Sequence, residues 1–259
     1  MLYPVFPTPL HQQTADLVKG YFSAIPQVDT ILAVNSCARG QASPESDLDF
    51  AILASPELTL AEIAQIERNW RLYLAEQEVY QEYKQLHPFA HLHLDVITGT
   101  YEPTIWDEGG GPDYFEVEIG NHLLYSAPMS QEGPYFQTLK QRWLPYYEES
   151  LRLQRLRMVI DACEFDLDHI PFYIKRGLYF QAFDRLYKAF QEFLQALFIA
   201  RRTYPSAYNK WIKEQVSDKL GLPGLYAVLP AILSLGSIES PEINEKAQVI
   251  RGLLAEYCK

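Results

Sequence analysis

The sequence contains few cysteines and no long apolar run, and each shortage excludes a class of protein. Three cysteines in 259 residues, all far apart, are too few for a disulfide framework or a metal-binding pair. The N-terminus also lacks the charged and apolar regions of a secretion signal, so we expect a protein of the reducing cytoplasm. No stretch reaches the length of a membrane-spanning helix, so we expect no membrane partner.

Basic residues are also scarce. Lys and Arg number 22 whereas Asp and Glu number 33, which gives a formal net charge of -11 at pH 7. A nucleic-acid-binding face would show as a basic excess, so we expect no such surface. An acidic surface suits a cationic small substrate, although solubility is the commoner reason for such a charge. Any anionic ligand must therefore be held by metal ions, a few basic side chains and backbone amides.

The first half of the chain mixes helical and extended patterns. Thr59 and Glu62 form a capping box that predicts the start of a long helix, and an earlier helix is expected at 11–24. Four apolar stretches predict strands, at residues 29–34, 47–53, 91–98 and 114–120.

Strand signals vanish after about residue 131, and helical signals continue to the C-terminus. Segment 176–202 is apolar enough, and rich enough in Phe and Leu, to be the central helix of a bundle. Prolines break the later amphipathic stretches into short pieces. We therefore expect an α+β protein with two domains, an α/β domain at 1–130 and an α-helical bundle at 131–259.

Three aspartates are predicted to lie on one face of the first domain's sheet. Asp47 and Asp49 share a face of their strand because side chains alternate along a strand. On the strand at 91–98, the same rule places Asp95 with His91 and His93. If the two strands are neighbours, the carboxylates converge, and two such charges about 5 Å apart repel by about 3 kcal/mol at an effective dielectric of about 20. Bound Mg²⁺, which prefers oxygen ligands, would offset that repulsion. For an isolated Asp-x-Asp pair, solvated strand ends are the commoner explanation.

The residues around these aspartates carry a longer pattern. Asn35 and Ser36 are followed by ten residues, "CARGQASPES", and then by Asp47 and Asp49 in "DLD". With Asp95 on a later strand, this stretch resembles the DNA polymerase β-like nucleotidyltransferase superfamily, whose signature is a strand, Gly-Ser or Gly-Gly, a spacer of similar length, Asp-x-Asp and a further Asp. Asn35 departs from the signature because it stands in the place of the first glycine. Asn tolerates left-handed backbone angles better than most residues, so we expect the turn to survive.

The second half resembles, more loosely, the C-terminal helices of bacterial antibiotic-modifying (aminoglycoside-type) nucleotidyltransferases and their uncharacterised relatives, over residues 175–211. The two resemblances imply a mixed sheet in the first domain and a helical domain that closes over the nucleotide and holds the acceptor. They imply an enzyme that moves AMP from ATP, or another nucleoside monophosphate, to a hydroxyl of a small molecule and releases pyrophosphate. The alternatives are a nucleotide-binding regulatory protein with low turnover, which Asn35 supports, and an antitoxin-like enzyme that adenylylates a partner protein.

The superfamily resemblance also implies roles for the matching residues. Asp47, Asp49 and Asp95 would be catalytic and would ligate two Mg²⁺ ions, which neutralise the charge on the transferring and leaving phosphates. Asp95 would act as a metal ligand or as the base for the acceptor hydroxyl. Ser36 and the amides at the start of a short helix expected at 37–40 would bind the terminal phosphates.

Four basic residues are candidates for contacts with the triphosphate. Arg39 lies in the loop before the aspartates, where solvated arginines are common. Arg185 and Lys188 lie one turn apart in the expected central helix, although Asp184 and Lys188 also have the spacing of an ordinary ion pair. Lys210 follows a Tyr-rich turn and is a candidate for binding phosphate or acceptor.

Three further features have weaker functional interpretations. His91 and His93, with the aspartate that follows them, favour a transition metal and a hydrolytic reaction, but this would leave the Asp-x-Asp loop unexplained. Glu116 and Glu118 are expected on the solvent side of a strand, where one is a candidate general base. The glycine run at 109–111 is a weak phosphate signal because it precedes an expected strand and not a helix, and no Walker sequence occurs.

Overall fold

The structure is a computed structural model that describes residues 3–104, 110–129 and 131–259. The chain forms two compact units. The first unit consists of Met1–Tyr101 and Ile119–Pro145, and the second consists of Glu102–Glu118 and Tyr146–Lys259. The chain therefore passes between the units three times. A single boundary after residue 130, as the sequence suggested, stays a prediction.

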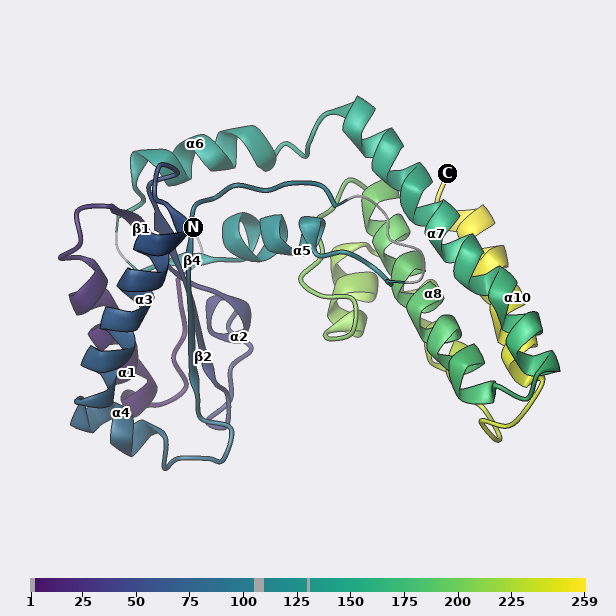
Figure 1. Cartoon of the computed structure of the whole chain (residues 1–259), viewed down its shortest axis with the longest axis horizontal. Helices are drawn as coiled ribbons and strands as arrows, with labels where there is room; N and C mark the ends of the chain where they lie inside the picture. The colour runs from purple at the N-terminus through teal and green to yellow at the C-terminus, as the bar shows by residue number, and fades with distance from the viewer. Residues whose placement is uncertain (1–2, 105–109, 130) are drawn as a thin grey trace. The chain divides into compact units, whose positions relative to one another are not determined.

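The first unit is built on a four-stranded sheet with the order β3-β2-β1-β4 (Figure 1). Its strands are β1 (Val28–Ala33), β2 (Leu48–Ala54), β3 (Leu92–Ile97) and β4 (Ala127–Pro128). β1 runs antiparallel to both β2 and β4, whereas β2 and β3 are parallel. The expected α+β class with a mixed sheet is confirmed.

Three helices pack on one face of this sheet (Figure 1). They are α1 (Pro9–Phe22), α3 (Leu60–Ala75) and α4 (Glu78–Tyr83). Phe50 and Ile52 of β2 join Phe22 of α1 and Trp70 of α3 in the hydrophobic core between them. The capping box before α3 is confirmed, because Thr59 Oγ1 accepts from the amide of Glu62, and the carboxylate of Glu62 accepts from the amide of Thr59 at 2.8 Å.

Hydrogen bonds at its N-terminus hold α6 (Pro134–Trp143) to the sheet. The two carboxylate oxygens of Asp29 in β1 accept hydrogen bonds from the amides of Tyr135 and Phe136, each at 3.0 Å. Gly133 precedes the helix, and a Cβ at this position would lie 2.3 Å from Asp29 Cγ. Gly133 is therefore required here by the close approach of the Asp29 side chain.

The prediction of a strand at 114–120 is wrong. These residues form α5 (Phe115–Ile119) and the start of a π-helix, η1 (Gly120–Leu124). Asp113 favours the helix because its side chain accepts a hydrogen bond from the amide of Phe115 at 3.0 Å. Five residues of alternating polarity are too few to distinguish a short helix from a strand. The fourth strand is β4 instead, and its two residues give no pattern that a sequence could reveal.

The second unit contains most of the helical residues (Figure 1). Its helices after residue 146 are α7 (Glu149–Lys175), α8 (Tyr179–Ala200), η2 (Glu214–Lys219), α9 (Pro223–Ile232) and α10 (Glu242–Tyr257). α8 is the central helix, as the sequence predicted, and it packs against both α7 and α10. In the described parts of the chain, none of the helices combines the length and the apolar character needed to cross a bilayer.

Candidate active site

The aspartate face of the first unit is set by the pairing of β2 with β3. Asp49 lies beside His93, and Ala51 lies beside Asp95, in the parallel register. Laterally paired residues point to the same side of a sheet, so Asp49 and Asp95 share a face opposite the core residue Phe50. The two strands are neighbours, which was the condition for the carboxylates to converge.

Asp47 lies just before β2 and contacts a histidine of β3. Its Oδ2 lies 3.6 Å from His93 Nε2, a distance longer than a hydrogen bond, and its side chain is 43% exposed. His91 lies beside His93, with a distance of 6.2 Å between ring centroids. Both imidazoles are exposed, so this end of the sheet is open to solvent.

A small cavity of about 110 Å³ opens on the aspartate face. Its walls include Asn35 from the loop after β1, Asp49 from β2, Asp95 from β3, and His122 from η1. Asp47 is absent from this lining. The structure thus brings Asp49, Asp95 and the Asn35 turn around one cavity and places Asp47 at its side.

The donors on this face have the chemistry that Mg²⁺ prefers, since Asp47, Asp49 and Asp95 all offer carboxylate oxygens. Across residues 3–104, 110–129 and 131–259, no three His, Cys, Asp or Glu side chains lie close enough together to hold a metal ion. The assignment of the three aspartates as ligands of two ions therefore stays a prediction.

The turn before the cavity adopts the backbone conformation that the sequence suggested. Asn35 has a φ of +55°, in the left-handed region that Asn tolerates. It begins α2 (Asn35–Ala38), two residues earlier than the expected short helix. The carbonyl of Ser36 accepts a hydrogen bond from the amide of Gln41 at 2.9 Å, which closes the loop. Cys37 next to Ser36 is buried, and burial with the nearby charge of Asp49 raises the pKa of its thiol to about 12.

Two buried side chains hold the loop that carries Asp47, and neither was expected from the sequence. His11 Nε2 lies 3.0 Å from the carbonyl oxygen of Ser46, and the hydroxyl of Tyr83 donates to the same oxygen at 3.3 Å. A carbonyl oxygen only accepts, so Nε2 of His11 carries the proton. Its Nδ1 then accepts from the hydroxyl of Thr8 at 2.7 Å. His11 and Tyr83 are both fully buried, so they fix the position of this loop from inside the core.

His122 in η1 is a further group that the sequence did not reveal, because the residues before it, 114–120, were interpreted as a strand. It lines the cavity with Asp49 and Asp95. Burial lowers the pKa of its imidazole to about 4, so the ring is neutral at pH 7. Its Nδ1 is buried and has no hydrogen-bond partner among the residues that the structure describes. A neutral imidazole in this position can exchange hydrogen bonds with a bound ligand.

The predicted basic residues do not gather in one described site. Arg39 is partly buried in the first unit, whereas the other three belong to the second unit. Arg185 forms an ion pair with the buried Asp166, and Lys188 forms one with Asp184 at 2.9 Å. The fourth, at position 210, is exposed in a loop. Their contacts with a triphosphate stay predictions, and Gly109 of the glycine run lies outside the described residues.

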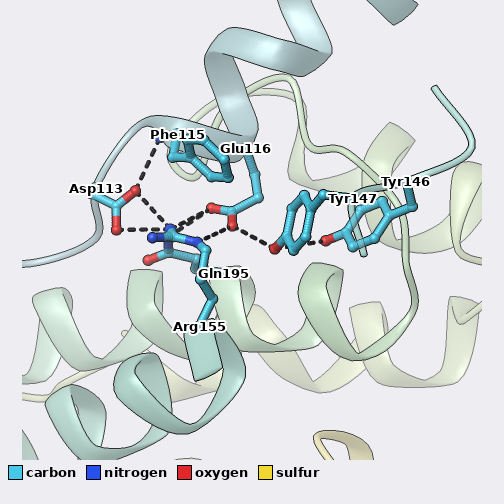
Figure 2. A network of polar contacts seen from close by, with 7 residues as sticks. All are labelled: Asp113, Phe115, Glu116, Tyr146, Tyr147, Arg155 and Gln195. Atoms are coloured by element: carbon cyan, nitrogen blue, oxygen red, sulfur yellow. Dashed lines mark hydrogen bonds and ion pairs between the residues drawn. The ribbon is translucent and has the colours of Figure 1, made fainter. Parts of the chain in front are cut away.

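Glu116 does not lie on a solvent-facing surface, and the sequence prediction for it is wrong. Its side chain is fully buried in the second unit, where Arg155 Nε donates to Oε1 at 2.5 Å. Tyr147 and Gln195 also donate to this carboxylate, at 2.8 and 3.0 Å (Figure 2). Nη2 of Arg155 donates to both oxygens of Asp113. These bonds join Asp113 and α5 to α7, and α5 to α8, a structural role that only the fold reveals.

Comparison with known proteins gives distant likenesses among solved structures. No protein-family model matches the chain, and no curated protein sequence is similar to it. Among solved structures, a nucleotidyltransferase-like protein from Exiguobacterium sibiricum 255-15 is similar over 95% of this chain and 74% of that chain. The TM-score is 0.43 and the identity is 13%. A likeness of this size carries no conclusion about function.

Proposed function

We propose that this protein is a nucleotidyltransferase that moves AMP from ATP to a hydroxyl of a small-molecule acceptor. The acceptor oxygen forms a bond to the α-phosphorus, and the bond from that phosphorus to the oxygen bridging to the β-phosphate breaks. Pyrophosphate leaves, and the acceptor hydroxyl loses its proton. The observation that supports this proposal is the cavity that Asp49 and Asp95 share with the left-handed turn at Asn35.

The aspartates are the residues that would hold Mg²⁺. When bound by Asp47, Asp49 and Asp95, the ions would supply neutralisation of the charge that develops on the phosphates. Ser36 and the amides of its turn would bind the terminal phosphates. Asp95 would accept the proton of the acceptor hydroxyl. Its side chain is exposed on the edge strand β3, so an acceptor that enters from solvent can approach it.

A transfer assay tests the proposal. The full-length protein is incubated with labelled ATP, Mg²⁺ and a panel of hydroxyl-bearing acceptors, and pyrophosphate release and labelled product are measured. We expect Asp49→Asn to reduce the rate by about 100-fold or more, because a carboxylate that ligates metal is lost. Asp16→Asn, at an exposed aspartate of α1, is the matched control and should leave the rate unchanged. Transfer that survives both Asp47→Asn and Asp49→Asn would contradict this mechanism.

A second candidate function is a nucleotide-binding regulatory protein with low turnover. It is favoured by Asn35, whose side chain stands at the cavity wall in the position of the signature glycine. Calorimetry separates the two functions. Tight binding of Mg-ATP without pyrophosphate release for any acceptor, in the natural protein and in Asn35→Gly, would favour the regulatory protein.

A further inference from the structure

The second unit contains a cavity that the proposed transfer reaction does not use. Its volume is about 160 Å³. α7 contributes Met158, Val159 and Ala162 to its wall, and α8 contributes Glu192 and Gln195. The segment before α5 closes another side with residues 110–113. All of these residues belong to one unit, so the cavity is a property of that unit alone.

Glu192 is the unusual group in this wall. Its side chain is 1% exposed, and both carboxylate oxygens are buried. Neither oxygen has a hydrogen-bond partner in the described parts of the chain. A buried carboxylate without donors is strongly unfavourable, and folded proteins satisfy nearly all such groups. Among the residues that the structure describes, Glu192 therefore has no hydrogen-bond donor.

The basic groups near Glu192 are already engaged. Arg185 forms an ion pair with Asp166, and Lys188 forms one with Asp184 at 2.9 Å. Burial and, to a lesser extent, the charge of Asp166 raise the pKa of Glu192, Arg185 and Lys188 oppose the shift, and the resulting pKa is about 8. The chain thus surrounds this carboxyl with too little positive charge to keep it ionised at pH 7.

The other walls are fixed before any ligand arrives. Asp113 is held through both oxygens by Arg155, at 2.8 and 2.9 Å, and the amide of Gln195 donates to Glu116 (Figure 2). Gly111 has a φ of +86°, and a Cβ there would lie 3.4 Å from Lys188 Cγ, so the backbone lies tight against α8.

We propose that this cavity binds the amine group of a small organic molecule, with the N–H donors bonded to the carboxylate of Glu192 and the carbon skeleton against Met158, Val159 and Ala162. The proposal does not depend on nucleotidyl transfer. A single carboxylate beside apolar side chains offers too few ligands for a metal ion. A neutral molecule of the same shape would leave the carboxylate without its ionic partner.

Proton linkage gives the proposal a pH signature. Binding of an ammonium group to Glu192 releases one proton wherever the free carboxyl is protonated, so affinity should rise about tenfold per pH unit below pH 8. It should level off above pH 8 and fall once the amine itself loses its proton. The charged and titratable groups that face Glu192 from the elements around it are Asp113, Cys163, Asp166, Arg185 and Lys188.

The experiment compares benzylamine with benzyl alcohol, which has the same shape and no charge. Binding to the full-length protein, without nucleotide, is measured by NMR titration from pH 6 to pH 9. We expect benzylamine to bind at least about tenfold more tightly than benzyl alcohol at pH 8, because only the amine forms a charge-assisted bond. Glu192→Gln should remove this preference. Asp161→Asn, at an aspartate of α7 that is 66% exposed, is the matched control and should retain it.

A second variant covers the case in which Glu192→Gln does not fold. Ala162→Leu fills the cavity, keeps Glu192, and should abolish benzylamine binding while circular dichroism shows a folded protein. Equal affinity for the amine and the alcohol, or a preference that survives in a folded Glu192→Gln or Ala162→Leu variant, would overturn the proposal. Asp49→Asn should leave amine binding intact, so failure of the transferase proposal and failure of this one are distinguishable.

Discussion

Single residues decide the chemistry of this protein through burial. Glu192 and His122 lie in different units, yet each has a pKa shifted toward its neutral form because its charged form would lose hydration. The aspartates of the first unit are partly or fully exposed. The two kinds of carboxyl are therefore suited to different partners: the exposed ones to hydrated ions, and the buried one to a ligand that brings its own donors.

His122 makes a prediction about acid stability. Its folded-state pKa of about 4 lies below the unfolded value of about 6.5, so its contribution to stability is present above pH 6.5 and is lost as the pH falls toward 4. We expect His122→Gln to reduce the loss of unfolding free energy between pH 7 and pH 4 by up to about 3 kcal/mol. Urea unfolding of both proteins at several pH values measures the loss of unfolding free energy.

The matched control for this prediction is His91→Gln, because His91 is exposed on the same unit. It should leave the pH dependence of the unfolding free energy as it is in the natural protein. An identical decline toward pH 4 in the natural protein and in His122→Gln would show that His122 is protonated freely in the folded state.

At the scale of elements, an ion-paired network joins Asp113 and the helix α5 to α7, and α5 to α8 (Figure 2). Arg155 is 2% exposed and provides the positive charge between Asp113 and Glu116. A buried pair of this kind adds little net stability compared with an apolar replacement of the whole set. Removal of one partner is different, because the charges left behind remain buried.

Arg155→Met should therefore lower the unfolding free energy by about 3–5 kcal/mol, since it leaves two carboxylates without their cation. Arg157→Met is the control on the same helix. Arg157 is 87% exposed and lies 4.0 Å from Asp161, so its loss should change stability by less than about 0.5 kcal/mol. Chemical denaturation of both variants gives the comparison, and equal midpoints would contradict a role for the network.

The elements also show where sequence patterns suffice. The capping box at Thr59 and the apolar face of α8 predicted their helices correctly, because both signals lie within a few residues. Alternation along β2 likewise placed Asp49 opposite Phe50. The pattern at 114–120 failed because a five-residue helix and a short strand bury similar apolar residues, and tertiary packing decides between them.

At the scale of the whole molecule, each unit has its own hydrophobic core. The core of the first unit draws on residues from Ala15 to Val96, and that of the second draws on residues from Val117 to Cys258. No buried core residue belongs to both clusters among the described parts of the chain. A cavity made in one core should therefore weaken the unit that contains it.

Leu186→Ala tests this at a fully buried residue of α8. We expect it to cost about 2–5 kcal/mol in the second unit, because a large-to-small change leaves a cavity. Hydrogen exchange measured by mass spectrometry should accelerate in α7, α8 and α10 and remain unchanged in β1 and β2. Leu153→Ala, at a leucine of α7 that is 53% exposed, is the control. Equal acceleration in both units would show one cooperative core.

The sequence by itself determined the α+β class, the helices and strands with strong periodicity and the left-handed turn at Asn35. Those features follow from local spacing, which a single chain displays directly. Only the tertiary structure decided that Glu116 is an ion-pair partner and that Glu192 lines a cavity and has no donor among the described residues. The donors to Glu116 lie 39 and 79 residues away in Arg155 and Gln195, and a periodic pattern contains no record of which distant residues meet.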